Sequence, residues 1–199
     1  VDFFPKTTQG ENGIYLQRAQ NGTYSNLDNF GDFTFKTTDT AWNLPIVILG
    51  DKAGNKDNEI IQAEPSTAEN SAIRVTLNGD YGLVHVTGSA QMTKASGSAR
   101  FFIYKGESGY TEPLWQATLS GLNSDSFDLS IPYTEGEQLF FSIDANGPDT
   151  DDWAAWNQIR FIAASDSVSP VLTAGAVYRT SATEATVRFV SDTAGTYYY

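Results

Sequence analysis

The stretch that decides the fold is LFFSIDANGPDTDDWAAWNQIRFI, residues 139–162. Two apolar runs flank a segment of Asp, Asn, Gly and Pro, the residues that favour turns. The apolar runs predict two strands, and the segment between them predicts a loop that the strands hold in place. With Trp153 and Trp156 at its exit, this loop offers carboxylates, amides and indoles. We therefore expect function here first, as binding of polyols or calcium.

The same β pattern continues outward from this stretch. Short runs of alternating polar and apolar residues recur, separated by turn signals such as Asn78-Gly79-Asp80 and Thr134-Glu135-Gly136. Further strands are predicted over 13–19, 30–36, 44–49, 71–76, 83–87, 99–105, 114–119, 127–131 and 137–144. A single helical turn is predicted over 150–156. Strands this short, spaced this closely, predict an all-β fold, an antiparallel sandwich or barrel.

Charge and composition exclude several classes of protein. The chain has 199 residues, of which 24 are acidic and 12 basic, and its formal net charge is −12 with a pI near 4.3. This charge repels phosphate backbones and anionic lipids, so we expect no nucleic-acid partner and no membrane insertion. Solubility alone also explains an acidic surface. The absence of cysteine excludes disulfides and zinc–thiolate sites.

A change in composition at Ser165 predicts a domain boundary. The linker SDSVSP, residues 165–170, precedes three predicted strands over 171–178, 184–190 and 196–199. Three short strands cannot close a sandwich. We expect one domain over 1–165, and over 166–199 a linker with either a truncated second module or an appendage of the first. The start at Val1 and the end on three tyrosines favour a piece of a longer multimodular protein.

The order of the motifs resembles the galactose-binding-like β-sandwich modules attached to bacterial polysaccharide-degrading enzymes and surface adhesins. The opening motif is Phe4, Gln9-Gly10, Asn12-Gly13 and Tyr15, and the closing motif is Asp152, Trp156, Ile159 and Phe161. Between them, in the order of the family, come 65–75, 80–88, FIYKG (102–106), Leu114-Trp115 and 133–144. The resemblance covers residues 3–163. It departs at WNQIRF (156–161), where the family usually has a Pro after the tryptophan.

This resemblance implies a jelly-roll sandwich that binds a polysaccharide or oligosaccharide without catalysis. It also implies secretion or surface display, with other modules in the same chain, and we expect a monomer. Residues 166–199 resemble the Ig-like repeats of Gram-positive surface proteins, whose third strand is typified by AGTYYY. Trp115 and Trp156 occupy positions that the family fills with tryptophan, so both are predicted to pack against the sheets.

The candidate sugar-binding residues are aromatic side chains in polar loops. Trp42, Trp153 and Tyr110 can stack on a pyranose ring, or can instead anchor their own loops. The polar partners nearest in sequence are Asn43, Asp149 and Asp151, although aspartates in such positions also cap turns. Isolated aromatic contacts suit a curved chain better than flat cellulose. The predicted ligand is therefore a starch-like α-glucan.

Calcium is a separate prediction, because the run DANGPDTDD (144–152) supplies many oxygen ligands. The predicted ligands are Asp144, Asn146, Asp149 and Asp152, although the run does not have EF-hand spacing. A second polar loop over 51–57 is an alternative place. The family resemblance also implies that a structural calcium is common.

Two other functional classes stay open. A structural or adhesive spacer requires that Trp42 and Trp153 are both buried. An enzyme fragment requires a cleft with two carboxylates or a metal. The only histidine, His85, lies within the strand pattern LVHVTG, where a packed or edge-strand role is favoured over catalysis or metal binding. No nucleophile elbow, P-loop or Rossmann glycine motif is present, so we predict no enzyme activity.

Overall fold

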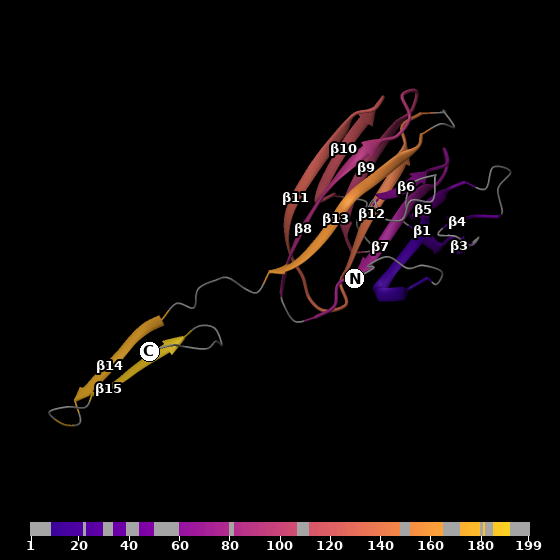
Figure 1. The fold of residues 1–199 in the computed structure, drawn as a ribbon. Helices are drawn as coiled ribbons and strands as arrows, with labels where there is room; N and C mark the ends of the chain where they lie inside the picture. The colour runs from indigo at the N-terminus through magenta and orange to yellow at the C-terminus, as the bar shows by residue number, and fades with distance from the viewer. Residues whose placement is uncertain are drawn as a thin grey trace. The chain divides into compact units, whose positions relative to one another are not determined.

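Alternating burial along the strands builds the fold in two layers. In strand β11 (Ser124–Pro132), Phe127 and Ile131 are buried, whereas Asp128 and Ser130 are exposed, as the pleat of a strand requires. The structure is a computed structural model (Figure 1). It describes residues 9–21, 23–29, 34–38, 44–49, 60–79, 82–106, 112–147, 152–164, 172–179, 181 and 185–191.

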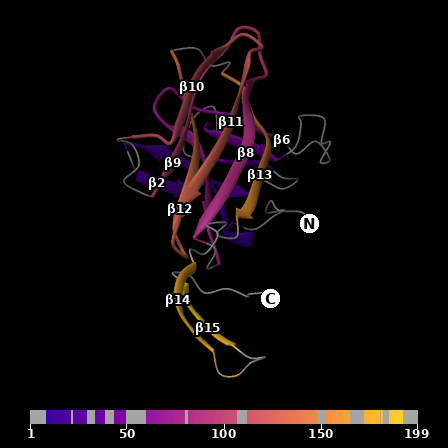
Figure 2. The same cartoon turned by 90° about the vertical axis from the view of Figure 1, so that its left-hand side faces the viewer.

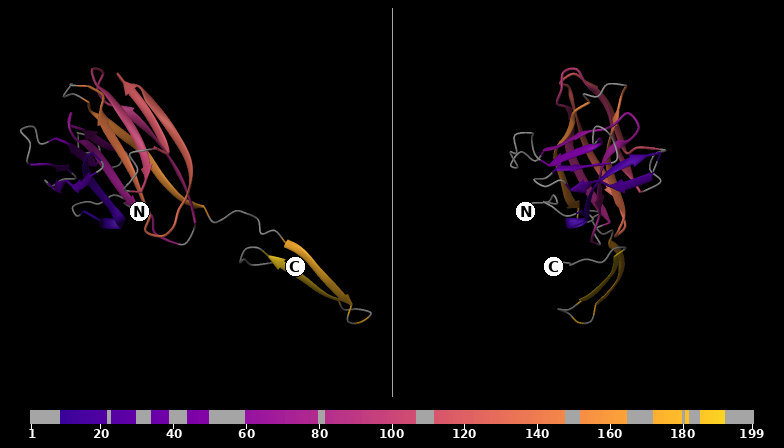
Figure 3. Two further views of the ribbon diagram at one scale, coloured as in Figure 1. Left: turned by 180° about the vertical axis from the view of Figure 1, so that it is seen from behind. Right: turned by 90° about the vertical axis from the view of Figure 1, so that its right-hand side faces the viewer.

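Two antiparallel sheets form the sandwich, which Figure 2 and Figure 3 show from other sides. The six-stranded sheet has the order β10 (Trp115–Ser120), β9 (Ser98–Lys105), β12 (Gln138–Ala145), β7 (Asn70–Thr76), β1 (Ile14–Gln20) and β2 (Thr23–Asn26). The seven-stranded sheet has the order β11, β8 (Leu83–Met92), β13 (Ala154–Ala164), β6 (Ile60–Glu64), β5 (Ile46–Leu49), β4 (Thr34–Lys36) and β3 (Asp28–Asn29). A short 3-10 turn, η1 (Glu11–Gly13), precedes β1.

An aromatic cluster fills the space between the sheets. Trp156 is 0% exposed, and its ring centroid lies 5.2 Å from that of Phe101 and 5.4 Å from that of Phe141, both on the opposite sheet. Trp115 lies 6.0 Å from Trp156 and packs on the same core. The predicted packing roles of the two tryptophans are therefore confirmed, as is the all-β antiparallel sandwich with a short C-terminal β extension.

The predicted helical turn over 150–156 is wrong where the structure describes it. Asp152 and Trp153 are not helical, and β13 begins at Ala154. The carbonyl of Trp153 accepts hydrogen bonds from the backbone N–H (2.9 Å) and the hydroxyl (3.1 Å) of Thr93, so this backbone is fixed to the neighbouring strand connection. Where the family has its Pro, β13 contains a bulge between Asn157 and Arg160.

The C-terminal part of the chain forms a unit of its own. The chain divides into residues 1–164 and 165–199, and the second unit contains the antiparallel pair β14 (Leu172–Arg179) and β15 (Ala185–Ser191). The third strand predicted there, 196–199, lies outside the described residues. Within the described residues, no helix has the length and apolar character needed to span a membrane.

Candidate functional site

Strand register gathers several connections at one end of the sandwich, which we call the loop end. In the six-stranded sheet, Gln20 pairs with Thr23, Ala19 with Asn70, and Ala145 with Ala99. In the seven-stranded sheet, Ala154 pairs with both Met92 and Ala63, and Ile46 pairs with Glu64. The loop end therefore comprises the connections β1–β2, β4–β5, β6–β7, β8–β9, β10–β11 and β12–β13, of which β10–β11 is included because Ser120 pairs with Ser98 and Ser124 with Gln91.

Five predicted sugar-site residues or calcium ligands lie outside the described residues: Trp42, Asn43, Tyr110, Asp149 and Asp151. Their flanking strands are described. The β4–β5 connection, which contains Trp42 and Asn43, begins and ends at the loop end, as does the β12–β13 connection. The β9–β10 connection, which contains Tyr110, begins and ends at the opposite end, because Trp115 pairs with Ile103 near the end of β9.

Ser98 joins the two described ends of the β12–β13 connection, residues 146–153, which we call the acidic loop. Its backbone N–H donates a 2.9 Å hydrogen bond to Oδ1 of Asp152, which is 2% exposed. Its hydroxyl accepts a 2.9 Å bond from Nδ2 of Asn146, whose own N–H donates to the Ser98 carbonyl at 3.2 Å. Two predicted calcium ligands thus meet at one serine, and both have protein partners there.

Asp144, the third described ligand of this prediction, forms an ion pair with Arg100 across the β12–β9 ladder. Burial raises the pKa of the Asp144 carboxyl, and the guanidinium of Arg100 opposes this rise. The effect of desolvation on the pKa of Asp144 is therefore larger than the opposing effect of the ion pair with Arg100.

The described residues do not fit a calcium site. Calcium takes six to eight oxygen ligands, whereas the carboxylates of Asp144 and Asp152 already bind protein groups. Among the described residues, no three Asp, Glu, His or Cys side chains group in a way that could hold a metal ion.

Trp153 is the last residue of the acidic loop before β13, and its side chain is half-buried. The spacer hypothesis requires full burial of this residue, which the structure does not show. Its backbone is fixed by Thr93, as described above, so the indole is attached to a fixed point of the backbone at the loop end.

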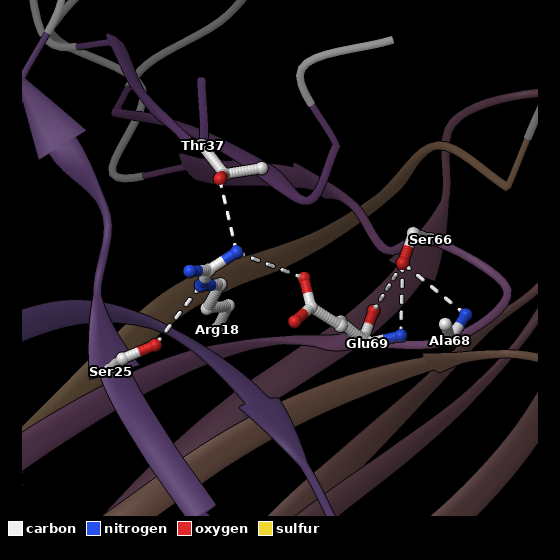
Figure 4. Close-up of polar contacts among 6 residues, drawn as sticks. All are labelled: Arg18, Ser25, Thr37, Ser66, Ala68 and Glu69. Carbon is white, nitrogen blue, oxygen red and sulfur yellow. Dashed lines mark hydrogen bonds and ion pairs between the residues drawn. The ribbon is translucent and has the colours of Figure 1, made fainter. Parts of the chain in front are cut away.

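A polar hollow lies at the loop end beside β1 and β2, and Figure 4 shows the polar contacts of Arg18 and Glu69, two of the residues that line it. Its volume is about 360 Å³, and it is lined by Arg18, Gln20, Asn21, Thr23, Ser25 and Glu69. We call it the Arg18 hollow. Arg18 donates from Nε to Ser25 Oγ at 3.0 Å and from Nη1 to Thr37 Oγ1 at 3.1 Å. Since Thr37 follows β4, this guanidinium connects the two sheets.

The sequence interpretation missed the Arg18 hollow, although one signal points to it. Ile14 and Leu16 are buried core residues, so the alternation of β1 directs Arg18 to the same inner side of the sheet. Arg18 is therefore a charged residue at the next inward-facing position after Ile14 and Leu16. Such a residue indicates that the space between the sheets opens to solvent at this point of the strand. The partners of Arg18 could not be found this way, because Glu69 is 51 residues away.

His85 lies on the outer face of the seven-stranded sheet, in β8. Its Nδ1 is 3.0 Å from Ser130 Oγ, and its Nε2 is 2.9 Å from Asp128 Oδ1. Both partners belong to β11 and point to the same face. The ring is hydrogen-bonded on an exposed sheet surface of an inner strand, rather than on an edge strand.

Comparison with known proteins yields matches among solved structures only. No protein-family model matches the chain, and no curated protein matches it. The xylan-binding family 22 module of Paenibacillus barcinonensis Xyn10C is 12% identical, with 66% of this chain and 81% of that chain covered and a TM-score of 0.35. The family 51 module of Clostridium perfringens GH95, in complex with methyl-galactose, is 10% identical, with 80% and 89% covered and a TM-score of 0.38.

A third match is a family 36 module in complex with calcium and xylotriose. It is 13% identical, with 73% of this chain and 98% of that chain covered and a TM-score of 0.32. These three structural neighbours are carbohydrate-binding modules, and the likeness is one of fold. Starch is not among the ligands that their names state.

Proposed function

We propose that residues 1–165 form a non-catalytic carbohydrate-binding module that holds a polysaccharide at the loop end. The observation that carries the proposal is the strand register, which brings the flanks of the Trp42 and Trp153 connections to the end that also carries the Arg18 hollow. A sugar site needs aromatic surface for the ring faces and polar groups for the hydroxyls. The loop end combines both kinds of side chain.

Five of the six predicted sugar-binding residues have a role in this proposal. Trp42 and Trp153 stack on sugar rings, while Asn43, Asp149 and Asp151 hydrogen-bond to hydroxyl groups. Tyr110 takes no part in this site, because its connection is flanked by strand ends at the opposite end of the sandwich.

The proposed ligand is a neutral polysaccharide, with a starch-like α-glucan as the first one to test. Xylan and galactan belong in the same panel, since xylan and methyl-galactose are the ligands named for two structural neighbours. We further propose that the module is monomeric, belongs to a secreted or surface-displayed protein of a Gram-positive bacterium, and works beside other modules. Modest affinity, with Kd between about 1 mM and 1 μM, would then be strengthened by avidity.

Native affinity electrophoresis tests the proposal. We expect gels that contain one polysaccharide of a panel (starch, xylan, galactan, mannan or mucin) to retard the whole chain. Trp42→Ala and Trp153→Ala should abolish the retardation, and Tyr110→Ala is the matched control that should leave it unchanged. Migration unaffected by every polysaccharide would overturn the proposal. Release of reducing ends would favour the enzyme fragment instead.

Calcium binding is tested separately. The calcium hypothesis keeps the predicted ligands Asp144, Asn146, Asp149 and Asp152, of which Asp149 lies outside the described residues and the other three have protein partners. It predicts that a chelator lowers the melting temperature and that added calcium restores it, since an ion bound only by the folded state stabilises that state. A melting temperature that ignores both additions would contradict it.

A further inference from the structure

We infer that the Arg18 hollow binds two neighbouring hydroxyl groups of a neutral sugar, with Arg18 donating to one oxygen and Glu69 accepting from the other. This inference rests on the proposed function and assigns it a subsite and a class of ligand. Neither residue is among those predicted from the sequence.

The hydrogen-bonding capacity of Glu69 is the first argument. Its side chain is 17% exposed, and its only partner among the described residues is Arg18, with 3.5 Å between Oε2 and Nη1. A carboxylate has about four lone-pair positions, and burying one with a single long contact is costly. A ligand hydroxyl in the hollow would supply the missing donor.

The balance of charge is the second argument. One guanidinium and one carboxylate line the hollow, and its other side chains are neutral amides and hydroxyls. Such a pair donates and accepts at adjacent points without a net charge. It therefore suits a neutral diol, whereas a uronate would meet Glu69 and a chain of net charge −12.

The local hydrogen bonds that position Arg18 and the backbone of Glu69 are the third argument (Figure 4). The turn that carries Glu69 is closed by Ser66, whose N–H donates to the Glu69 carbonyl and whose Oγ accepts from the Glu69 N–H, both at 2.9 Å. Ser25 and Thr37 hold the guanidinium of Arg18. The guanidinium of Arg18 and the backbone that carries Glu69 are thus held in place before a ligand arrives, which reduces the entropic cost of binding.

The size of the hollow sets the extent of the ligand. Its volume of about 360 Å³ is near the lower limit of small-molecule sites, roughly 300 Å³. We therefore assign it a single sugar unit, with the rest of the chain running over the loop end.

The test measures binding of the polysaccharide that retards the wild type. Glu69→Gln keeps the size of the side chain but removes the charged acceptor, and should weaken binding about tenfold or more. Glu137→Gln is the matched control, because Glu137 pairs with Lys105 at 2.9 Å at the opposite end, and its affinity should stay within about twofold. Circular dichroism and the melting temperature verify folding. Glu69→Asp keeps the negative charge but shortens the side chain, so the carboxylate no longer reaches the ligand and binding should also weaken. This variant replaces Glu69→Gln in the test if Glu69→Gln does not fold.

Each outcome decides the inference. Wild-type affinity in a folded Glu69→Gln or Glu69→Asp variant, with binding still lost in Trp153→Ala, would overturn the hydroxyl site and leave the proposed function standing. Tighter binding of polygalacturonate than of neutral galactan, or unchanged binding after periodate has cleaved the vicinal diols of the ligand, would also overturn it. If the wild type binds no polysaccharide, both the inference and the proposed function fail.

Discussion

Trp156 belongs to the seven-stranded sheet, but it contacts aromatic rings of both sheets. Replacing it with Ala removes its contacts with Phe101, Phe127 and Phe141, and should lower the free energy of unfolding by about 3–5 kcal/mol. Urea denaturation measures this loss. The matched control is Ile162→Ala on the same strand, where a side chain 54% exposed should matter by less than about 1 kcal/mol. Equal losses in the two variants would contradict the assigned packing role.

Single residues show where sequence reasoning reaches its limit. Trp115 and Trp156 could be assigned to packing because they match positions that the resembled family fills with tryptophan. Asp152 looked like a metal ligand, yet its carboxylate bonds to the Ser98 N–H, 54 residues away. Arg18 was not predicted to be functional, because its partners come from strand β2 and from the β4–β5 and β6–β7 connections. The amino-acid sequence shows which chemical groups are present, but it does not show which residues they contact in the folded chain.

Strand β8 contains a glycine that its neighbours require. A Cβ on Gly88 would lie 2.6 Å from Cζ of the buried Phe127, its cross-strand partner, and 3.1 Å from the carbonyl of Asn157. Gly88→Ala should therefore destabilise the fold by about 1–3 kcal/mol through overpacking. Thermal unfolding measures the loss, with Ser89→Ala as the control on the same strand. A variant as stable as the wild type would mean that the Phe127 ring can move aside without cost.

The turn between β11 and β12 should give the fold a dependence on pH. Hydrogen bonds from Lys105 and from the Thr134 N–H (2.7 Å) hold the pKa of Glu137 below its usual value of 4.5. A carboxyl whose pKa is lowered by folding adds stability above its unfolded pKa, and this stability is lost as the pH falls through the folded pKa.

The wild type should therefore be more stable than Glu137→Gln at neutral pH, and the difference should vanish well below pH 4.5. Denaturant titrations of the two proteins across this range measure it. A difference that grows as the pH falls would have the wrong sign for this mechanism.

Most strands were predictable because one face of each is buried, which imposes alternation on the sequence. The strands that were missed lack that signal. β2 is largely exposed along its length, and β6 combines Ile60 and Ile61 with a buried Glu64, so neither alternates cleanly. The predicted helical turn over 150–156 failed because its polar residues resemble a helix start, whereas long-range bonds to Ser98 and Thr93 fix the described backbone.

At the scale of the whole molecule, the fold class was predictable but the loop end was not. Repeated alternation predicts a sandwich whatever the pairing of its strands. Knowing which loops share an end requires strand register, and register is set by pairs as distant as Ala63 with Ala154. The proposed site can therefore be located only from the sheet topology, even though the tryptophans proposed for it are easily noticed in the sequence.

The same scale yields a prediction about the two units. Among the residues whose burial the structure describes, the buried core lies between Ile14 and Trp156, within the first unit. A fragment of residues 1–164 should therefore fold alone and melt within about 2 °C of the whole chain, since a loss of about 1 kcal/mol already shifts the melting temperature of a domain this size by that much. Differential scanning calorimetry of the two proteins measures the shift. A fragment that melts several degrees lower would show that residues 165–199 stabilise the sandwich, and would assign them to the first domain as an appendage.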